Sequence, residues 1–296
     1  MKLLAPAKIN LSLDIVGRRS DGYHLLRMVM QSISLYDTVS LTKTGSGPLK
    51  VCCNKPDIPC GDENTVMRAA RAFWSETGIA AESGLLFQVD KNIPAQSGLG
   101  GGSTDAAAAL KLLNCWFGAG LSEAQLCQIG LSVGADVPFC LRGGTALAEG
   151  IGEKLQPVFP LPHCWIVVCR PTEGCSTGKV YSSFDACGLS PKLYTDGLLK
   201  ALCSGKIREI GRHLGNSFEV SCPFGNIVKI REKMISCDSL GACMTGSGSA
   251  VYGLFDDREK ALQCCEKLSG KYPFAVLCEP VSSKQQESGG VGCQPQ

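Results

Sequence analysis

A glycine-rich segment at residues 94–109, PAQSGLGGGSTDAAAA, contains the residues best suited to chemistry. Four glycines within positions 98–102 lead directly into Ser103 and Thr104, and a run of alanines follows. Glycine leaves peptide N–H groups exposed enough to contact an anion, and the N-terminus of a helix attracts negative charge. The segment therefore predicts a loop wrapped around phosphate groups. The alternative is a tight strand-to-helix turn without a ligand.

Two familiar phosphate-binding loops do not fit this segment. A Walker A loop ends in Gly-Lys-Ser/Thr, but no lysine follows Gly102. A dinucleotide fingerprint needs a third glycine, where Ser103 stands, and an acidic residue about 20 positions later, where the chain reads AQLCQIG. We expect Ser103 or Thr104 to cap a helix of about three turns through AAAALKLLNCWF.

Composition bounds the class of protein. The 296 residues suffice for one large domain or two modest ones, and 44% of them are hydrophobic, which argues against extensive disorder. Lys and Arg total 29 against 27 Asp and Glu, so no general field favours nucleic acid or an anionic membrane. We expect no signal peptide and no membrane span.

The 18 cysteines do not follow a zinc or disulfide pattern, because the chain contains no Cys-x-x-Cys pair. Cys140, Cys169 and Cys243 lie in apolar stretches, where a cysteine behaves as a small hydrophobe. A reducing cytoplasm is therefore the expected setting.

The elements that must position the loop follow from periodicity. Strands are expected at 2–16, 28–43, 85–89, 143–150, 151–158, 164–171, 248–255 and 273–281, and helices at 63–78, 106–117, 122–134, 190–205, 224–238 and 258–270. A domain boundary is expected near residue 158. The polar, glycine-rich tail at 282–296 is expected to be disordered.

Five segments, taken in order, carry a resemblance to a known family. They are PAKINLSL (6–13), DGYH (21–24), PAQSGLGGGSTDAA (94–107), GADVPF (134–139) and MTGSGSAVYGLF (244–255). Together they resemble the GHMP kinase superfamily, named for galactokinase, homoserine, mevalonate and phosphomevalonate kinases. The resemblance implies an α+β, two-domain GHMP kinase fold. An N-terminal domain at 1–158 would be like the second domain of ribosomal protein S5, and a C-terminal domain at 159–281 would be ferredoxin-like.

The same resemblance implies an ATP-dependent small-molecule kinase with an alcohol as acceptor. DGYH and GADVPF are similar to the branch that phosphorylates the 2-hydroxyl of a cytidine-diphosphate-linked methylerythritol in non-mevalonate isoprenoid synthesis. The alternatives are another GHMP kinase or decarboxylase, a non-catalytic sensor on the same fold, and, from the glycine loop alone, a dinucleotide oxidoreductase.

Asp136 and Lys8 are the expected catalytic residues. A kinase must place a hydroxyl in line with the γ-phosphorus, spread the developing charge and receive a proton. Asp136 is a weak base, which a loose transition state tolerates, although on its own such an aspartate would cap a turn. Lys8 lies among apolar residues, where an ammonium needs a partner. In the family this lysine faces the catalytic aspartate, and the bland alternative is an edge lysine on a half-exposed strand.

The expected ligand contacts divide into two sets. Tyr23 and His24 would read a cytosine by stacking and hydrogen bonding, with the remaining substrate contacts made by Asn10, Thr177, Tyr181 and Gly246. ATP would contact Asn64, Thr65, Pro94, Ala95, Gln96, Ser97, Gly98, Leu99, Gly100, Gly101, Gly102, Ser103 and Thr104, with Asn64 and Thr65 alternatively capping a helix.

Magnesium should bridge the β- and γ-phosphates, with Ser103 as a ligand. Asp105 would repel phosphates unless it points away, caps the helix or meets the metal. Gln96-Ser97 and Ser249-Ala250 depart from the family's usual Gly-Gly and Pro-Thr. The expected partner is the cytidine-diphosphate substrate, with no nucleic acid and no membrane, for a monomer or weak homodimer in the cytoplasm.

Overall fold

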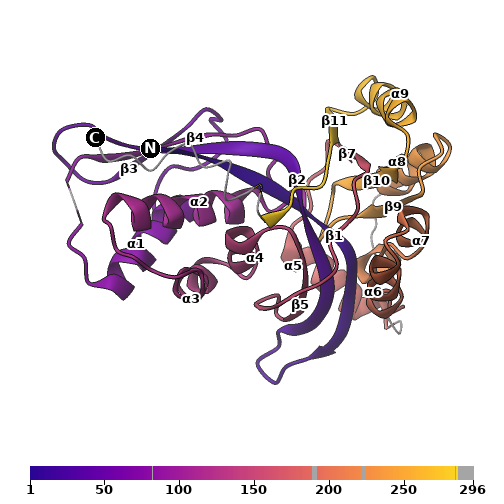
Figure 1. The fold of residues 1–296 in the computed structure, drawn as a ribbon, viewed down its shortest axis with the longest axis horizontal. Helices are drawn as coiled ribbons and strands as arrows, with labels where there is room; N and C mark the ends of the chain where they lie inside the picture. Colours follow the sequence, from indigo (N-terminus) through magenta and orange to yellow (C-terminus); the bar gives the residue numbers. More distant parts are fainter. Residues whose placement is uncertain (82, 189–191, 222–224, 284, 286–296) are drawn as a thin grey trace.

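The computed structural model describes residues 1–81, 83–188, 192–221, 225–283 and 285, and two β-sheets organise this part of the chain (Figure 1). The first has seven strands: β1 (Lys2–Arg18), β2 (His24–Lys43), β3 (Lys50–Cys53), β4 (Leu85–Asp90), β5 (Thr145–Gly150), β6 (Lys154–Pro157) and β8 (Gly215–Asn216). The order is β3-β4-β2-β1-β8, and β5 and β6 extend it beside the other half of β2.

The second sheet is antiparallel, with the order β11-β7-β10-β9. It contains β7 (Trp165–Arg170), β9 (Gly241–Met244), β10 (Val251–Phe255) and β11 (Phe274–Cys278). Figure 1 shows the long β1–β2 hairpin running from the region of β3 and β4 to the side of the second sheet. The mixture of sheets and helices is the α+β architecture that the resemblance implied.

Helices cover the two sheets. They are α1 (Thr65–Thr77), α2 (Gly101–Trp116), α3 (Glu123–Val133), α4 (Val137–Arg142), α5 (Thr177–Cys187), α6 (Thr195–Ser204), α7 (Ile207–Arg212), α8 (Gly225–Ile235) and α9 (Arg258–Ser269), with a 3-10 turn at Ser217–Ser221. Figure 1 places α1–α4 beside the first sheet and α6–α9 on the side of the second. None of the helices in the described ranges is long and apolar enough to cross a bilayer.

The helix signals in the sequence are confirmed at α1 and α3. In α1 the residues at helical spacing, including Val66 and Phe73, are buried, and Gly78 ends the helix with a φ of +65°. In α3 Ser122 and Gln125 form a capping box. The apolar cysteines are also buried as expected, and burial raises the pKa of Cys169 to about 12.

Several elements escaped the sequence analysis: β3, α4, α5, α7, β8 and β9. Most are too short to show a period, and α4 has only 6 residues with Pro138 in its first turn. Part of the expected helices at 190–205 and 224–238 lies outside the described residues, and within these ranges α6 spans Thr195–Ser204 and α8 spans Gly225–Ile235.

The later part of the chain also completes the first sheet. Strand β8 pairs in parallel with β1, and Pro280 bridges Ile33 on β2. The expected boundary at 158 falls between β6 and β7, but β8 crosses it. Of the tail, residues 284 and 286–296 lie outside the described residues, and Gln285 hydrogen-bonds Ser282.

Candidate active site

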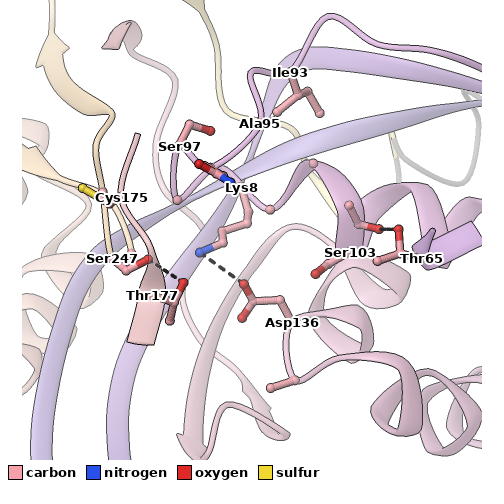
Figure 2. A pocket seen from close by; sticks show the side chains of 18 of the residues that line it. Lys8, Thr65, Ile93, Ala95, Ser97, Ser103, Asp136, Cys175, Thr177 and Ser247 are labelled. Atoms are coloured by element: carbon pink, nitrogen blue, oxygen red, sulfur yellow. Dashed lines mark hydrogen bonds and ion pairs between the residues drawn. The ribbon is translucent and has the colours of Figure 1, made fainter. Parts of the chain in front are cut away.

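Lys8 and Asp136 meet in one cavity of about 750 Å³ (Figure 2). The Lys8 Nζ lies 3.4 Å from the Asp136 Oδ2 and donates a hydrogen bond of 2.9 Å to the Asn10 Oδ1. The Lys8 side chain is only 5% exposed, so its charge depends on these partners. The Asp136 side chain is 31% exposed, which leaves the carboxylate accessible from the cavity.

The chain between α3 and α4 places Asp136 there. Gly134 ends α3 in an extended conformation, and the Val137 N–H bonds the Gly134 carbonyl at 3.1 Å. Asp136 stands at the N-cap position of α4, yet its side chain makes no capping hydrogen bond. The alternative reading as a capping aspartate therefore does not describe its contacts.

The β1 strand aims Lys8 at the cavity because its side chains alternate. Ala7 and Ile9 belong to a hydrophobic cluster with the second sheet, whereas Lys8 and Asn10 are buried polar residues that line the cavity. The backbone N–H of Asn10 donates to the Thr245 hydroxyl at 3.0 Å, which ties β1 to the 244–250 loop.

The glycine-rich loop runs directly along Lys8. The Lys8 N–H donates to the Leu99 carbonyl at 3.0 Å, and a Cβ on Gly100 would lie 2.9 Å from the Lys8 Cγ. A Cβ on Gly98 would lie 2.1 Å from the Thr245 carbonyl oxygen. With φ values of +77° at Gly98 and +73° at Gly100, both positions require glycine for conformation and for space.

The expected N-cap of α2 was wrong. The helix begins at Gly101, its N-cap is Gly100, and no side chain caps it. Ser103 and Thr104 instead lie inside the first turn. The first N–H groups of a helix have no intrahelical partner, so an end that no side chain caps is free to bind an anion. Because Gly101, Gly102 and Ser103 line the cavity, this end faces it.

Most of the expected ATP-binding residues line this cavity: Asn64, Thr65, Pro94, Ala95, Gln96, Ser97, Gly98, Gly100, Gly101, Gly102 and Ser103. Leu99 and Thr104 are 0% and 2% exposed, belong to the packed interior and do not line the cavity. Asn64 caps α1 through a 2.8 Å bond from the Val66 N–H, and the Thr65 hydroxyl donates to the Gly102 carbonyl at 2.7 Å. The capping alternative for Asn64 is thus observed.

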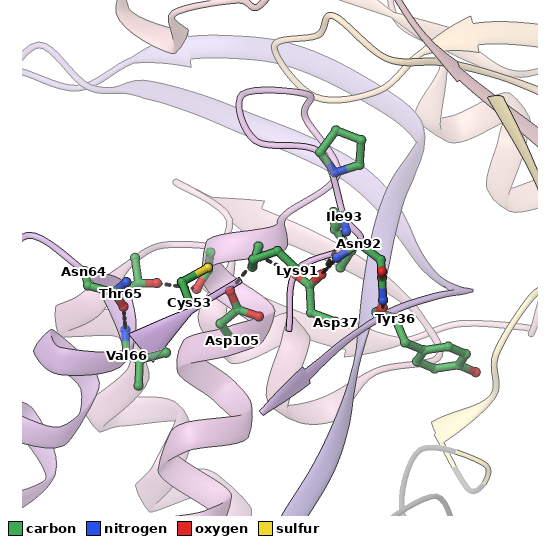
Figure 3. Close-up of polar contacts among 12 residues, drawn as sticks. Tyr36, Asp37, Cys53, Asn64, Thr65, Val66, Lys91, Asn92, Ile93 and Asp105 are labelled. Carbon is green, nitrogen blue, oxygen red and sulfur yellow. Dashed lines mark hydrogen bonds and ion pairs between the residues drawn. The ribbon is translucent and has the colours of Figure 1, made fainter. Parts of the chain in front are cut away.

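A buried charge cluster lies beneath the start of α2 (Figure 3). Lys91 donates to both Asp37 and Asp105, at 2.6 Å in the case of Asp105. Burial raises the pKa of Asp105 to about 7, with a further contribution from Asp37 and against the pull of the Lys91 ammonium. Asp37 also accepts from the Asn92 and Ile93 N–H groups, at 2.6 and 2.8 Å. Asp105 therefore pairs with a lysine, and Asp37 anchors the entry to the glycine loop.

A second hollow of about 530 Å³ adjoins the first, and the two share Leu26, Ala135, Ile151, Thr177 and Tyr181. Tyr23 and His24 line the second hollow, and Tyr23 is 63% exposed. The His24 ring stacks on Tyr181 with centroids 4.7 Å apart. The expected base readers therefore gather at one end of the combined cavity, away from α2.

The 244–250 loop packs directly against the glycine loop and lines the same cavity. Gly246 has a φ of +56°, and the Ser247 hydroxyl lies 3.1 Å from that of Thr177. The Asn216 carboxamide donates to the carbonyls of Met244 and Gly246, at 2.9 and 2.8 Å. This loop is consequently fixed by buried hydrogen bonds.

The two departures from the family pattern both fall at contacts between these loops. Gln96 has a φ of +51°, which is uncommon for a residue other than glycine. The Ser97 hydroxyl donates a hydrogen bond to the Pro94 carbonyl at 2.6 Å. The Ala250 N–H donates to the Ser97 carbonyl at 3.0 Å, and Ser249 donates to the Glu173 carbonyl.

Sequence reasoning missed three residues that shape the site. Thr245 joins Asn10 to the glycine loop, Asn216 holds the 244–250 loop, and Lys91 lines the cavity. Thr245 lies within the MTGSGS motif, and Lys91 lies three residues before Pro94. Nothing in its sequence neighbourhood marks Asn216.

Comparison with known proteins agrees with this geometry. The model of the GHMP kinase N-terminal domain matches residues 64–144, and that of the GHMP kinase C-terminal domain matches 198–273. The chain therefore belongs to the GHMP kinases, which are ATP-dependent. The 4-diphosphocytidyl-2-C-methyl-D-erythritol kinase of Clostridium botulinum is 43% identical over 92% of this chain and 97% of its own. That of Clostridium kluyveri is 42% identical over 95% and 100%.

Solved structures extend the likeness. A crystal structure of 4-(cytidine 5'-diphospho)-2C-methyl-D-erythritol kinase superposes with a TM-score of 0.79 at 33% identity, covering 95% of this chain and 99% of the other. A homoserine kinase from Cytophaga hutchinsonii shares the fold, with a TM-score of 0.73 at 17% identity over 95% of this chain and 94% of its own. The chain belongs to the 4-diphosphocytidyl-2-C-methyl-D-erythritol kinases of the GHMP kinase superfamily.

Proposed function

We propose that this protein transfers the γ-phosphoryl group of ATP to the 2-hydroxyl of 4-diphosphocytidyl-2-C-methyl-D-erythritol. One observation carries the proposal: the Lys8 Nζ and the Asp136 Oδ2 lie 3.4 Å apart in a cavity that the start of α2 also lines. A phosphoryl acceptor needs a base, and a transferring phosphoryl group needs positive charge and N–H donors. The pair and the helix N-terminus supply them.

In this proposal Asp136 accepts the proton of the attacking hydroxyl at its carboxylate. Lys8 pairs with that carboxylate and stabilises charge on the transferred group. The Asn10 Oδ1 accepts from the Lys8 Nζ at 2.9 Å and so directs the ammonium. The backbone N–H groups at the start of α2 hold phosphate oxygens. The hollow at Tyr23 and His24 takes the cytosine, and the shared lining joins the two ends of one substrate channel.

The Ser103 hydroxyl and the phosphates of ATP are oxygen ligands of the kind that Mg²⁺ prefers. Ser103 presents a hydroxyl in the first turn of α2, on the cavity wall, and hydroxyls are acceptable ligands for a hard cation. No group of three His, Cys, Asp or Glu side chains within the described ranges could hold a metal by itself, so the ATP phosphates would supply most ligands. When bound, the ion would neutralise phosphate charge.

A coupled assay for ADP release tests the proposal. The cytidyl substrate should support turnover, whereas mevalonate and homoserine should not. Asp136→Asn keeps the shape of the side chain and should lower kcat by about 10²–10⁴-fold with little change in ATP affinity. Near-normal turnover of Asp136→Asn would refute its role as the base.

His24→Ala tests the base-reading end of the cavity independently. The Michaelis constant for the cytidyl substrate should rise, because hydrogen bonding of the imidazole to the base is lost, while kcat changes less. An unchanged Michaelis constant would count against base recognition at His24.

We also propose a cytoplasmic monomer or weak homodimer. Buried free thiols such as those of Cys164, Cys169 and Cys278 support a reducing compartment. Sedimentation at micromolar concentration tests the oligomeric state, and a tight dimer would contradict it.

A further inference from the structure

The His24 side chain is held on two sides. Its ring stacks on Tyr181 with centroids 4.7 Å apart and an interplanar angle of 29°, and it meets the Phe184 ring edge-on at 6.3 Å. Tyr181 and Phe184 in turn both pack edge-on against Phe218, at 4.8 and 5.9 Å. Only 9% of the His24 side chain is exposed. The aromatic cluster therefore fixes the plane of the imidazole.

Asp185 on α5 fixes the rotation of the ring within that plane. Its Oδ1 lies 2.7 Å from the His24 Nε2, and its Oδ2 lies 3.4 Å from an Arg18 guanidinium nitrogen. These contacts join the end of β1, the start of β2 and α5 around the second hollow. Asp185 is 36% exposed, so it contacts the hollow without being buried in it.

The chemistry of the contact determines which nitrogen carries a proton. An ionised carboxylate only accepts hydrogen bonds, so the His24 Nε2 must donate. In the neutral imidazole, Nδ1 is then an acceptor. Cytosine presents an exocyclic amino donor at the position where uracil presents a carbonyl acceptor. An Nδ1 acceptor therefore suits the amino group of cytosine and repels the carbonyl of uracil.

We propose that Asp185 is a positioning residue that sets the preference for cytosine over uracil by holding the His24 Nε2 proton. The inference rests on the proposed function, because it requires the cytidyl end of the substrate to bind at His24. It adds the residue that determines base specificity. Asp185 acts through His24 and does not itself need to contact the base.

Asp185→Asn is the informative substitution because it preserves size and removes only the restriction on the proton. The asparagine oxygen accepts from an Nε2–H, whereas its NH₂ group donates to a bare Nε2, so both tautomers of His24 become acceptable. The ratio of kcat/KM for cytidine- over uridine-diphosphate-linked methylerythritol should fall about tenfold, with kcat for the cytidyl substrate nearly unchanged. An unchanged ratio overturns the inference.

Two further measurements separate this role from a structural one. In a double-mutant cycle, Asp185→Asn should have no effect on the ratio when His24 is already alanine, and full additivity overturns the inference. Nitrogen-15 spectra of the ring should show the Nε2–H tautomer in the wild type and a mixture in Asp185→Asn. An Nδ1–H tautomer in the wild type also overturns it.

Asp256→Asn is the matched control, because Asp256 is 31% exposed and pairs with Arg208 at 2.6 Å in another part of the surface. It should leave the ratio unchanged. Failure of the inference is distinguishable from failure of the proposed function: if the wild type does not phosphorylate the cytidyl substrate, the function fails. If it does and Asp185→Asn keeps the same base preference, only the role of Asp185 fails.

Discussion

The charge cluster beneath the start of α2 should make the protein less stable as pH rises, and Asp105→Asn should abolish that loss of stability. Lys91 provides one ammonium for two buried carboxylates, those of Asp37 and Asp105. The Asp105 Oδ1 is buried without a hydrogen-bond partner in the described part of the chain. Ionising Asp105 in the folded protein is therefore costly, and asparagine has no charge to bury.

The magnitude follows from the pKa of Asp105, which burial raises from 3.8 to about 7 in the folded protein. Between these values the folded state holds a proton that the unfolded state has lost, so stability falls as pH rises. The difference of about three units between the two pKa values corresponds to a loss of about 4 kcal/mol in the free energy of unfolding. This loss is complete above pH 7 to 8. From pH 5 to pH 8, the stability of Asp105→Asn relative to the wild type should increase by about 2–3 kcal/mol.

Urea unfolding of both proteins at pH 5, 6, 7 and 8 measures this difference directly, provided that the slope with urea is the same. Asp37→Asn is the contrasting variant. Because Asp37 also accepts from the Asn92 and Ile93 N–H groups, its replacement should destabilise the protein at every pH. A difference between Asp105→Asn and the wild type that does not change from pH 5 to pH 8 would refute the reasoning.

Three more predictions concern the loops around the cavity. Gly98→Ala would place a Cβ 2.1 Å from the Thr245 carbonyl oxygen, so it should destabilise the protein by about 1–3 kcal/mol and raise the Michaelis constant for ATP. An unchanged denaturant midpoint together with an unchanged Michaelis constant would contradict this. Gln96→Gly relieves a φ of +51° and should raise the melting temperature by about 2 °C in calorimetry, whereas a lower value would show that the side chain matters more than the backbone. Asn64→Ala removes the bond from the Val66 N–H and should cost about 1 kcal/mol in urea unfolding, and no loss would argue against the cap.

Local patterns in the sequence were enough to predict the helices and strands whose apolar residues recur at a regular spacing. The α1 and α3 helices, with Gly78 and Ser122 at their ends, follow from spacing and capping that involve neighbours only. The glycine loop was equally readable, because positive φ and close approach leave glycine as the residue that fits. Its helix start was misplaced, since Ser103 and Thr104 are good caps in general and Gly100 caps this helix without any side chain.

The partners of the charged residues were not readable from local patterns. The sequence did not show how the carboxylate of Asp105 is accommodated near phosphates. Its partner is Lys91, whose position depends on strand β4 and on Asp37 of β2. Likewise Asp185 lies 161 positions from His24, and no period connects them. A resemblance could name Lys8 and Asp136, but the structure was needed to measure their separation.

The sequence by itself determined the family, the glycine loop and the residue types that can handle phosphate, because short motifs express backbone requirements that act over a few residues. Only the tertiary structure decided which charges meet. Lys8 and Asp136 are brought to 3.4 Å by a strand and a helix start that are distant in the chain. The physical reason is that a buried charge is tolerable only beside its partner, and that partner is chosen by packing in three dimensions.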